Sequence, residues 1–154
     1  MPNSVREQIE LNLKTVLESV VTPTYGQTIR KVYRYGQPFT DLPTIPAAQI
    51  IPDNENKEPR PHPLYSCVAN YTIALVVESQ SETIAAAVNQ ILADVEKALM
   101  IDVTRGGLAT ETLIRGNSVF ENGPAEPIGD CRLRISVKYR HQYGDPFTAS
   151  PYEI

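Results

Sequence analysis

Few residues of this 154-residue chain have the type and spacing that chemistry requires. Its two cysteines, Cys67 and Cys131, are isolated from each other and form no CxxC metal or redox motif. His62 and His141 have no Cys, Asp or Glu at the spacing of metal ligands. A cysteine nucleophile paired with His141 is the one catalytic arrangement to weigh, because such partners meet in space rather than in sequence.

The pattern around Cys131 argues against that nucleophile. This residue falls on the apolar face of a predicted strand, where burial would suppress the reactive thiolate. We expect both thiols to be reduced and buried, and a disulfide would need their strands to be neighbours in register. The sequence therefore predicts no catalytic, cofactor-binding or metal site, and the protein is not expected to be an enzyme.

The composition is that of one globular domain. Apolar residues make up 42% of the chain and charged residues 21%, and the net charge of -4 with a pI near 5.2 disfavours broad nucleic-acid binding. No apolar run reaches the roughly 18 residues that would span a bilayer, and the N-terminus lacks the pattern of a signal peptide. We expect a protein that stays where it is made and does not enter a membrane.

Two segments have helical periodicity. A capping box formed by Ser4 and Glu7 opens an amphipathic helix over about residues 4–21, which must end before Pro23. The same spacing at Ser79 and Glu82 precedes a second helix of about five turns. We expect the glycine pair at 106–107 to stop this second helix, since glycine readily adopts the left-handed conformation.

The remaining periodic segments predict strands. They cover about residues 28–35, 44–51, 64–79, 110–121 and 129–143. Prolines 46 and 52 place the second of these on a sheet edge, because proline cannot donate to a strand ladder. Residues 52–63 are predicted to be a mobile polar loop, and residues 144–154 an extended C-terminal tail.

These elements predict a single α+β domain over residues 1–143. Four to five strands form a largely antiparallel sheet with both amphipathic helices on one face, in the order α-β-β-β-α-β-β. The last strand alternates apolar residues with a basic row at Arg132, Arg134, Lys138 and Arg140. This row is either an ordinary solvated face or an interface for a negatively charged second copy or partner.

Several segments resemble those of a known family in their order along the chain and in the kinds of residue they contain. These segments are "SVREQI", "YTIALVVES", "ETIAAAVNQILADVEKALMID", "GGLA" leading into "ETLIRGNSVFE", and "LRISVKYRHQYGDP". Together they resemble the tail terminator (tail completion) proteins of long-tailed bacteriophages. The resemblance covers most of the chain, and each motif taken singly is common.

The resemblance implies a structural virion protein without enzymatic activity or cofactor. Such a protein forms a homohexameric ring at the head-proximal end of the tail tube, stops tube polymerisation and offers a surface for joining the head. Its implied partners are other copies of itself, the tail tube protein, a head-tail connector or neck protein and, in a contractile tail, the sheath. DNA would pass through the ring without sequence-specific recognition.

A ring of this kind needs two unlike surfaces on each subunit. The basic row and the tail are the candidate interface, with these residues: Arg132, Arg134, Lys138, Arg140, Pro146, Phe147 and Tyr152. Two other functions stay open, a head-tail connector or neck protein and a cellular ligand-binding α+β module. Binding to tail tube or portal complex separates the first from a terminator, and a ligand that raises the melting temperature would indicate the second.

Overall fold

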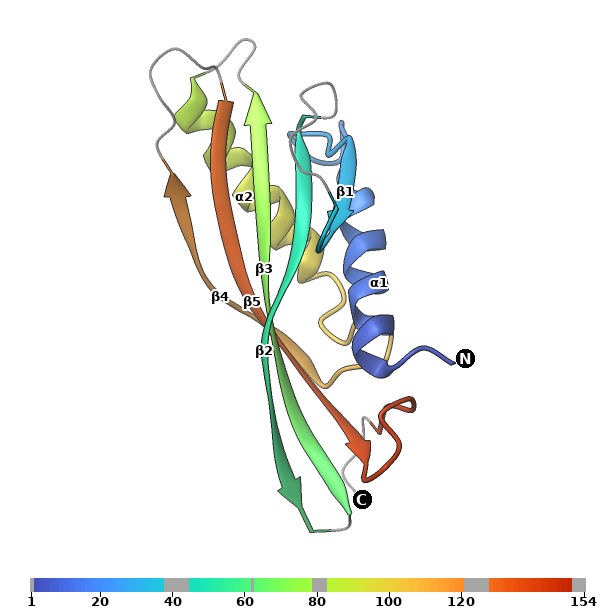
Figure 1. Cartoon of the computed structure of the whole chain (residues 1–154). Helices are drawn as coiled ribbons and strands as arrows, with labels where there is room; N and C mark the ends of the chain where they lie inside the picture. The colour runs from blue at the N-terminus through green and yellow to red at the C-terminus, as the bar shows by residue number, and fades with distance from the viewer. Residues whose placement is uncertain (1, 38–44, 62, 79–82, 121–127, 151–154) are drawn as a thin grey trace.

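A computed structural model describes residues 2–37, 45–61, 63–78, 83–120 and 128–150 (Figure 1). Within these ranges it contains helices α1 (Val5–Glu18) and α2 (Ile84–Leu99) and one five-stranded sheet. Its strands are β1 (Lys31–Arg34), β2 (Ala47–Arg60), β3 (Leu64–Glu78), β4 (Glu111–Phe120) and β5 (Ile128–Gln142). The strand order is β1-β2-β3-β5-β4, and only the β1–β2 pair is parallel. The predicted α+β class and element order are confirmed.

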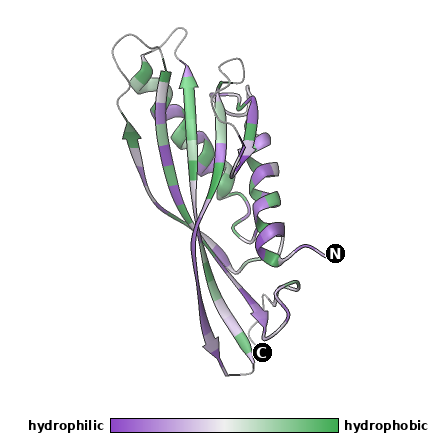
Figure 2. Cartoon of the chain, viewed as in Figure 1, coloured by the Kyte–Doolittle hydropathy of each residue, from purple (hydrophilic) through white to green (hydrophobic). Residues whose placement is uncertain are grey.

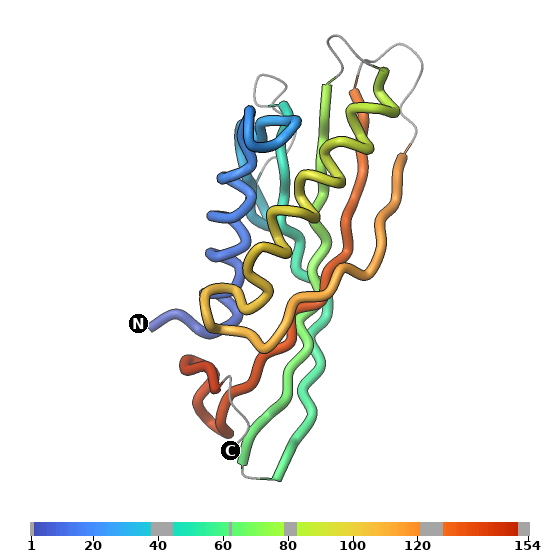
Figure 3. The backbone as a smooth tube through the Cα atoms, turned by 180° about the vertical axis from the view of Figure 1, so that it is seen from behind, coloured from blue at the N-terminus to red at the C-terminus, as the bar shows by residue number. Residues whose placement is uncertain are grey.

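Both helices cover the same face of the sheet, as the two opposite views show (Figures 1 and 3). Along β3 and β5 every second side chain faces them, so hydrophobic and hydrophilic residues alternate along β5 (Figure 2). The core residues of these two strands are at most 3% exposed: Cys67, Ala69, Tyr71, Ile73, Leu75, Val77, Cys131, Leu133, Ile135, Val137 and Tyr139. The predicted apolar faces of both strands are therefore confirmed.

The helix starts follow from capping hydrogen bonds. Ser4 Oγ accepts from the amide of Glu7 at 3.1 Å, which confirms one half of the predicted capping box. The Glu7 carboxylate instead accepts from the guanidinium of Arg34 through both of its oxygens, each at 2.6 Å. The second helix begins after Thr83, whose hydroxyl accepts from the amide of Ala86 at 3.2 Å. The capping box predicted at 79–82 lies outside the described residues.

The prediction of a mobile loop over residues 52–63 is wrong. Residues up to Arg60 continue β2 and pair with β3, in a ladder that runs from Glu55 opposite Ala69 to Arg60 opposite Leu64. These two strands extend together beyond the helices (Figure 1), so this part of β2 has no core to bury and can be polar. The low hydrophobicity of the segment reflects the exposure of most of its residues rather than a lack of backbone pairing.

The prediction that residues 44–51 form an edge strand is also wrong for the paired part. Residues 47–50 lie between β1 and β3 in the sheet. Pro46 precedes the strand, and Pro52 follows the last residue that pairs with β1. Neither proline therefore lies within residues 47–50, which pair with a strand on each side and where a missing amide would break a ladder hydrogen bond.

The glycine pair does not stop α2, contrary to prediction. The helix ends at Leu99, and a turn then carries the chain to β4. Within this turn Arg105 has a positive φ of 52° and no exposed surface, and its guanidinium donates to the carbonyls of Leu99 and Asp102. A buried arginine therefore satisfies the end of the helix, while Gly106 and Gly107 provide the left-handed turn that follows.

We predict that Arg105→Gly lowers the free energy of unfolding by about 3 kcal/mol, because the carbonyls of Leu99 and Asp102 lose their donor and a cavity remains. Glycine accepts the positive φ without strain, so this variant isolates the side chain from the backbone. Urea unfolding followed by circular dichroism measures the change. A stability equal to that of the wild type would show that only the backbone conformation matters at this position.

Candidate functional site

The side of the sheet opposite the helices is the candidate interaction surface, and we call it the open face. The pairing register assigns to it the side chains that alternate with the core residues. Its small side chains Thr72, Ala74 and Ser136 are 9% exposed or less, and the longer side chains of Asp53 and Arg115 bond to Thr72 and Ser136. The open face is thus a layer of short side chains beneath long polar ones.

The basic row predicted on the last strand lies on this face. Arg132 stacks over the ring of Phe120, with its guanidinium carbon 5.3 Å from the ring centroid. The side chain of Arg134 extends across β4 at Gly116. A Cβ added at this glycine would lie 3.0 Å from Nη2 of the arginine. Glycine at 116 therefore leaves room for the guanidinium.

The two remaining members of the row are more constrained. Lys138 Nζ forms an ion pair with Glu111 Oε1 at 3.0 Å, so part of its charge is already neutralised. Arg140 is half-buried, and its backbone carbonyl accepts from the amide of Ser150 at 2.8 Å. The cationic character of the open face is therefore concentrated near Arg132 and Arg134.

A chain of hydrogen bonds crosses the open face from β4 to β2. Arg115 Nε donates to Ser136 Oγ at 3.0 Å, and the Ser136 hydroxyl donates to Asn70 Oδ1 at 2.6 Å. Asn70 Nδ2 in turn donates to Asn54 Oδ1 at 3.2 Å. We call these four side chains the polar chain, and they link the two outer strands of this part of the sheet.

Sequence reasoning missed Arg115 and the polar chain for a physical reason. An irregularity between Ile114 and Gly116 adds one residue to β4, and another lies between Pro52 and Glu55 in β2. Each shifts the alternation of its strand by one residue, so a period-two pattern misassigns the side chains beyond it. A charged residue next to a glycine in a strand was the only signal present in the sequence.

The C-terminal segment does not join the basic row. Residues 144–150 turn back onto α1 and the end of β5, where the carbonyl of Pro146 accepts from the Val5 amide at 2.8 Å. The described part of this segment therefore folds back against α1 and β5 and is not the extended tail that was predicted. Pro146 and Phe147 lie on the helix side of the sheet, and Tyr152 lies outside the described residues.

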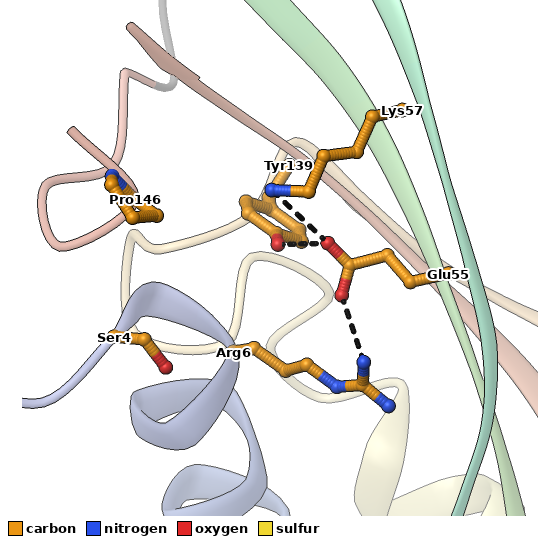
Figure 4. A pocket seen from close by; sticks show the side chains of 6 residues that line it. All are labelled: Ser4, Arg6, Glu55, Lys57, Tyr139 and Pro146. Atoms are coloured by element: carbon orange, nitrogen blue, oxygen red, sulfur yellow. Dashed lines mark hydrogen bonds and ion pairs between the residues drawn. The ribbon is translucent and has the colours of Figure 1, made fainter. Parts of the chain in front are cut away.

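A pocket of about 410 Å³ lies where this segment meets α1 and the projecting part of β2. Figure 4 shows Glu55 at its centre, between the tyrosine hydroxyl and two cationic side chains. The carboxylate accepts from Tyr139 at 2.5 Å and lies 3.3 Å from Arg6 and 3.6 Å from Lys57. Burial and the hydrogen bond to Glu55 raise the pKa of Tyr139. Glu55 thus has partners on all sides within the chain, and these contacts link α1 to β2 and β5.

The structure places Cys131 far from His141, whereas Cys67 lies opposite Tyr139, two residues from His141, where burial raises the pKa of its thiol. Both thiols are free and buried, and burial raises the pKa of Cys131 to about 12. Cys131 and His141 share a face of β5 but are ten residues apart, about 33 Å along an extended strand. His141 is instead held between Lys57 Nζ and the carbonyl of Gln142, each at 2.7 Å, while His62 lies outside the described residues. The nucleophile alternative has no geometric basis for Cys131.

No group of three or more His, Cys, Asp and Glu side chains among the described residues could hold a metal ion. Neither described helix is long and apolar enough to cross a membrane.

We predict that truncation after Tyr143 lowers the free energy of unfolding by about 2–3 kcal/mol, since the Val5 amide and the Arg140 carbonyl lose their partners. Pro146→Ala is the matched control, because it keeps the backbone carbonyl that the amide of Val5 needs. Thermal and urea unfolding measure both variants. A truncated protein as stable as the wild type would show that the segment contributes nothing to the fold.

Two comparisons with known proteins give no match for this chain. No protein-family model matches it, and no curated protein does. Its function is therefore inferred from the sequence pattern and from the surface described above.

Proposed function

We propose that this protein is a tail terminator of a long-tailed bacteriophage, a structural virion protein rather than an enzyme. In this proposal several copies, six by resemblance, form a ring on the head-proximal end of the tail tube. The ring stops tube polymerisation and presents a surface for joining the head. The protein is made and assembled in the host cytoplasm and remains at the head-tail junction.

The observation that carries the proposal is the unneutralised charge of the open face. Arg115, Arg132 and Arg134 form no salt bridge within the part of the chain that the structure describes, although the whole protein has a net charge of -4. A row of cations on a rigid sheet favours docking of an acidic surface in one orientation. An assembly protein with an acidic partner explains this surface better than solvation alone.

The arrangement of the sheet also suits a ring. One face is occupied by the helices, and the sheet has different strands at its two edges, β4 on one side and β1 with the projecting part of β2 on the other. A closed ring requires such unlike surfaces, because each subunit contacts its two neighbours differently. The proposed partners are further copies of the chain, the tail tube protein, the connector or neck protein and, in a contractile tail, the sheath.

The proposal predicts that deleting this gene alone produces abnormally long tail tubes that are not attached to heads. Negative-stain electron microscopy of the lysate measures the tube lengths directly. Tubes of normal length that remain unjoined would instead assign the protein to the connector or neck. Intact infectious particles would contradict both assignments and leave the ligand-binding module as the function to test.

We predict that Arg134→Glu combined with Lys138→Glu weakens attachment of the protein to tubes by about tenfold or more, because like charges then face the acidic partner. Co-sedimentation with purified tubes measures the binding, and circular dichroism checks the fold. Lys138→Glu alone is the matched control with a smaller expected effect, since Glu111 already neutralises part of this charge. Unchanged attachment of the double variant would remove the basic row from the interface.

A further inference from the structure

We propose that neighbouring subunits of the ring meet edge to edge, with Arg115 on β4 of one copy paired to Asp53 on β2 of the next. This inference rests on the proposed ring but specifies a contact that the ring alone does not require. It follows from the strand register, the unpaired charges at the two sheet edges and the polar chain that joins them.

The described structure leaves two stretches of strand without a neighbour on one side. β1 pairs with β2 only as far as Ile50, so residues 51–60 of β2 contact β3 and no second strand within the described residues. β4 pairs only with β5 and forms the opposite edge of the same sheet. Each subunit therefore offers two unlike edges, as a head-to-tail ring requires.

The register places Arg115 and Asp53 at nearly the same level along the strands. Arg115 falls between Ile114 and Gly116, which lie opposite Ile135 and Arg134 of β5. Those two residues pair with Tyr71 and Thr72 of β3, whose own partners on β2 are Pro52 and Ile51, directly before Asp53. The two levels differ by about one residue, or roughly 3.4 Å. Rotation about an axis nearly parallel to the strands, without a large translation, would thus bring the two side chains together.

The charges at these positions are complementary. Asp53 is exposed, and its Oδ2 accepts from the hydroxyl of Thr72 at 2.7 Å, which leaves Oδ1 without a hydrogen bond in the described structure. Arg115 is exposed, and only its Nε has a partner, the hydroxyl of Ser136. The rest of the guanidinium is free to donate to a carboxylate, and such charge-assisted bonds are stronger than neutral ones.

The hydrogen bonds of the polar chain continue this contact through the interior of each subunit's open face, from one sheet edge to the other. It begins at Arg115 on one edge and ends at Asn54, the residue that follows Asp53, on the other. An Arg115–Asp53 contact between copies would therefore join one polar chain to the next around the ring. Fixed polar partners hold both ends in place, which reduces the entropy lost on association.

The same features disfavour the wrong contacts. Two β4 edges brought together would oppose two arginines, and two β2 edges would oppose two aspartates, so a two-fold dimer is penalised. Pro52 removes one amide, and the irregularities in β2 and β4 break the regular ladder at both edges. Side-chain charge, rather than a long backbone ladder, would then set the register between subunits.

Charge exchange tests the pair directly. Arg115→Asp and Asp53→Arg are each expected to reduce ring formation by at least tenfold in apparent association constant, and the double variant is expected to regain most of it. Light scattering and analytical ultracentrifugation across a concentration series measure assembly, with Lys14→Asp on α1 as the matched control. Failure of the double variant to recover, while both single variants remain folded, would overturn the pairing.

Cysteine trapping supplies an independent readout. The Arg115→Cys, Asp53→Cys double variant should form a ladder of covalent oligomers on mild oxidation, because both native thiols are buried. Neither single variant nor a Lys14→Cys, Asp53→Cys variant should form this ladder. No ladder from the double variant would overturn the inference. If rings nevertheless form by light scattering, the proposed function survives the loss of this contact, whereas a wild type that forms rings neither alone nor on tubes contradicts the ring itself.

Discussion

The antiparallel pairing of β3 with β5 is the interaction on which the rest of the structure depends. These two fifteen-residue strands pair along their whole length, from Leu64 opposite Gln142 to Glu78 opposite Ile128. Because side chains alternate across a strand, this one register places an apolar stripe under the helices and a polar one on the open face. A slip of a single residue would bury the arginines and expose the core.

The outer strands have more freedom, and the proposed function uses it. The extra residues in β2 and β4 interrupt the regular ladder at the two edges while the central pair stays regular. At these points Asn54 and Arg115 bond to Asn70 and Ser136 of the central strands. The rigid centre thus positions edge groups that have few partners within their own chain, which is the arrangement an assembling subunit needs.

The elements with strong periodicity could be predicted from the sequence, and those fixed by tertiary contacts could not. The alternation in β3 and β5 and the N-cap serine at position 4 are local signals, and the structure confirms them. Residues 52–60 were misassigned because hydrophobicity reports burial, and these residues pair with β3 without burying apolar surface. The role of Arg105 was missed because its partners, Leu99 and Asp102, are recognised only once the turn has folded around them.

The candidate surface was predictable in part for the same reason. The basic row followed from the alternation in β5, whereas Arg115 and Asp53 depend on irregularities that no periodic pattern reveals. Electron cryomicroscopy of the head-tail junction in intact particles is the most direct test of the central claim. The account predicts a sixfold ring at the head-proximal end of the tube, with density that fits this α+β fold. A tube end without this fold, or with it located elsewhere in the particle, would contradict the account.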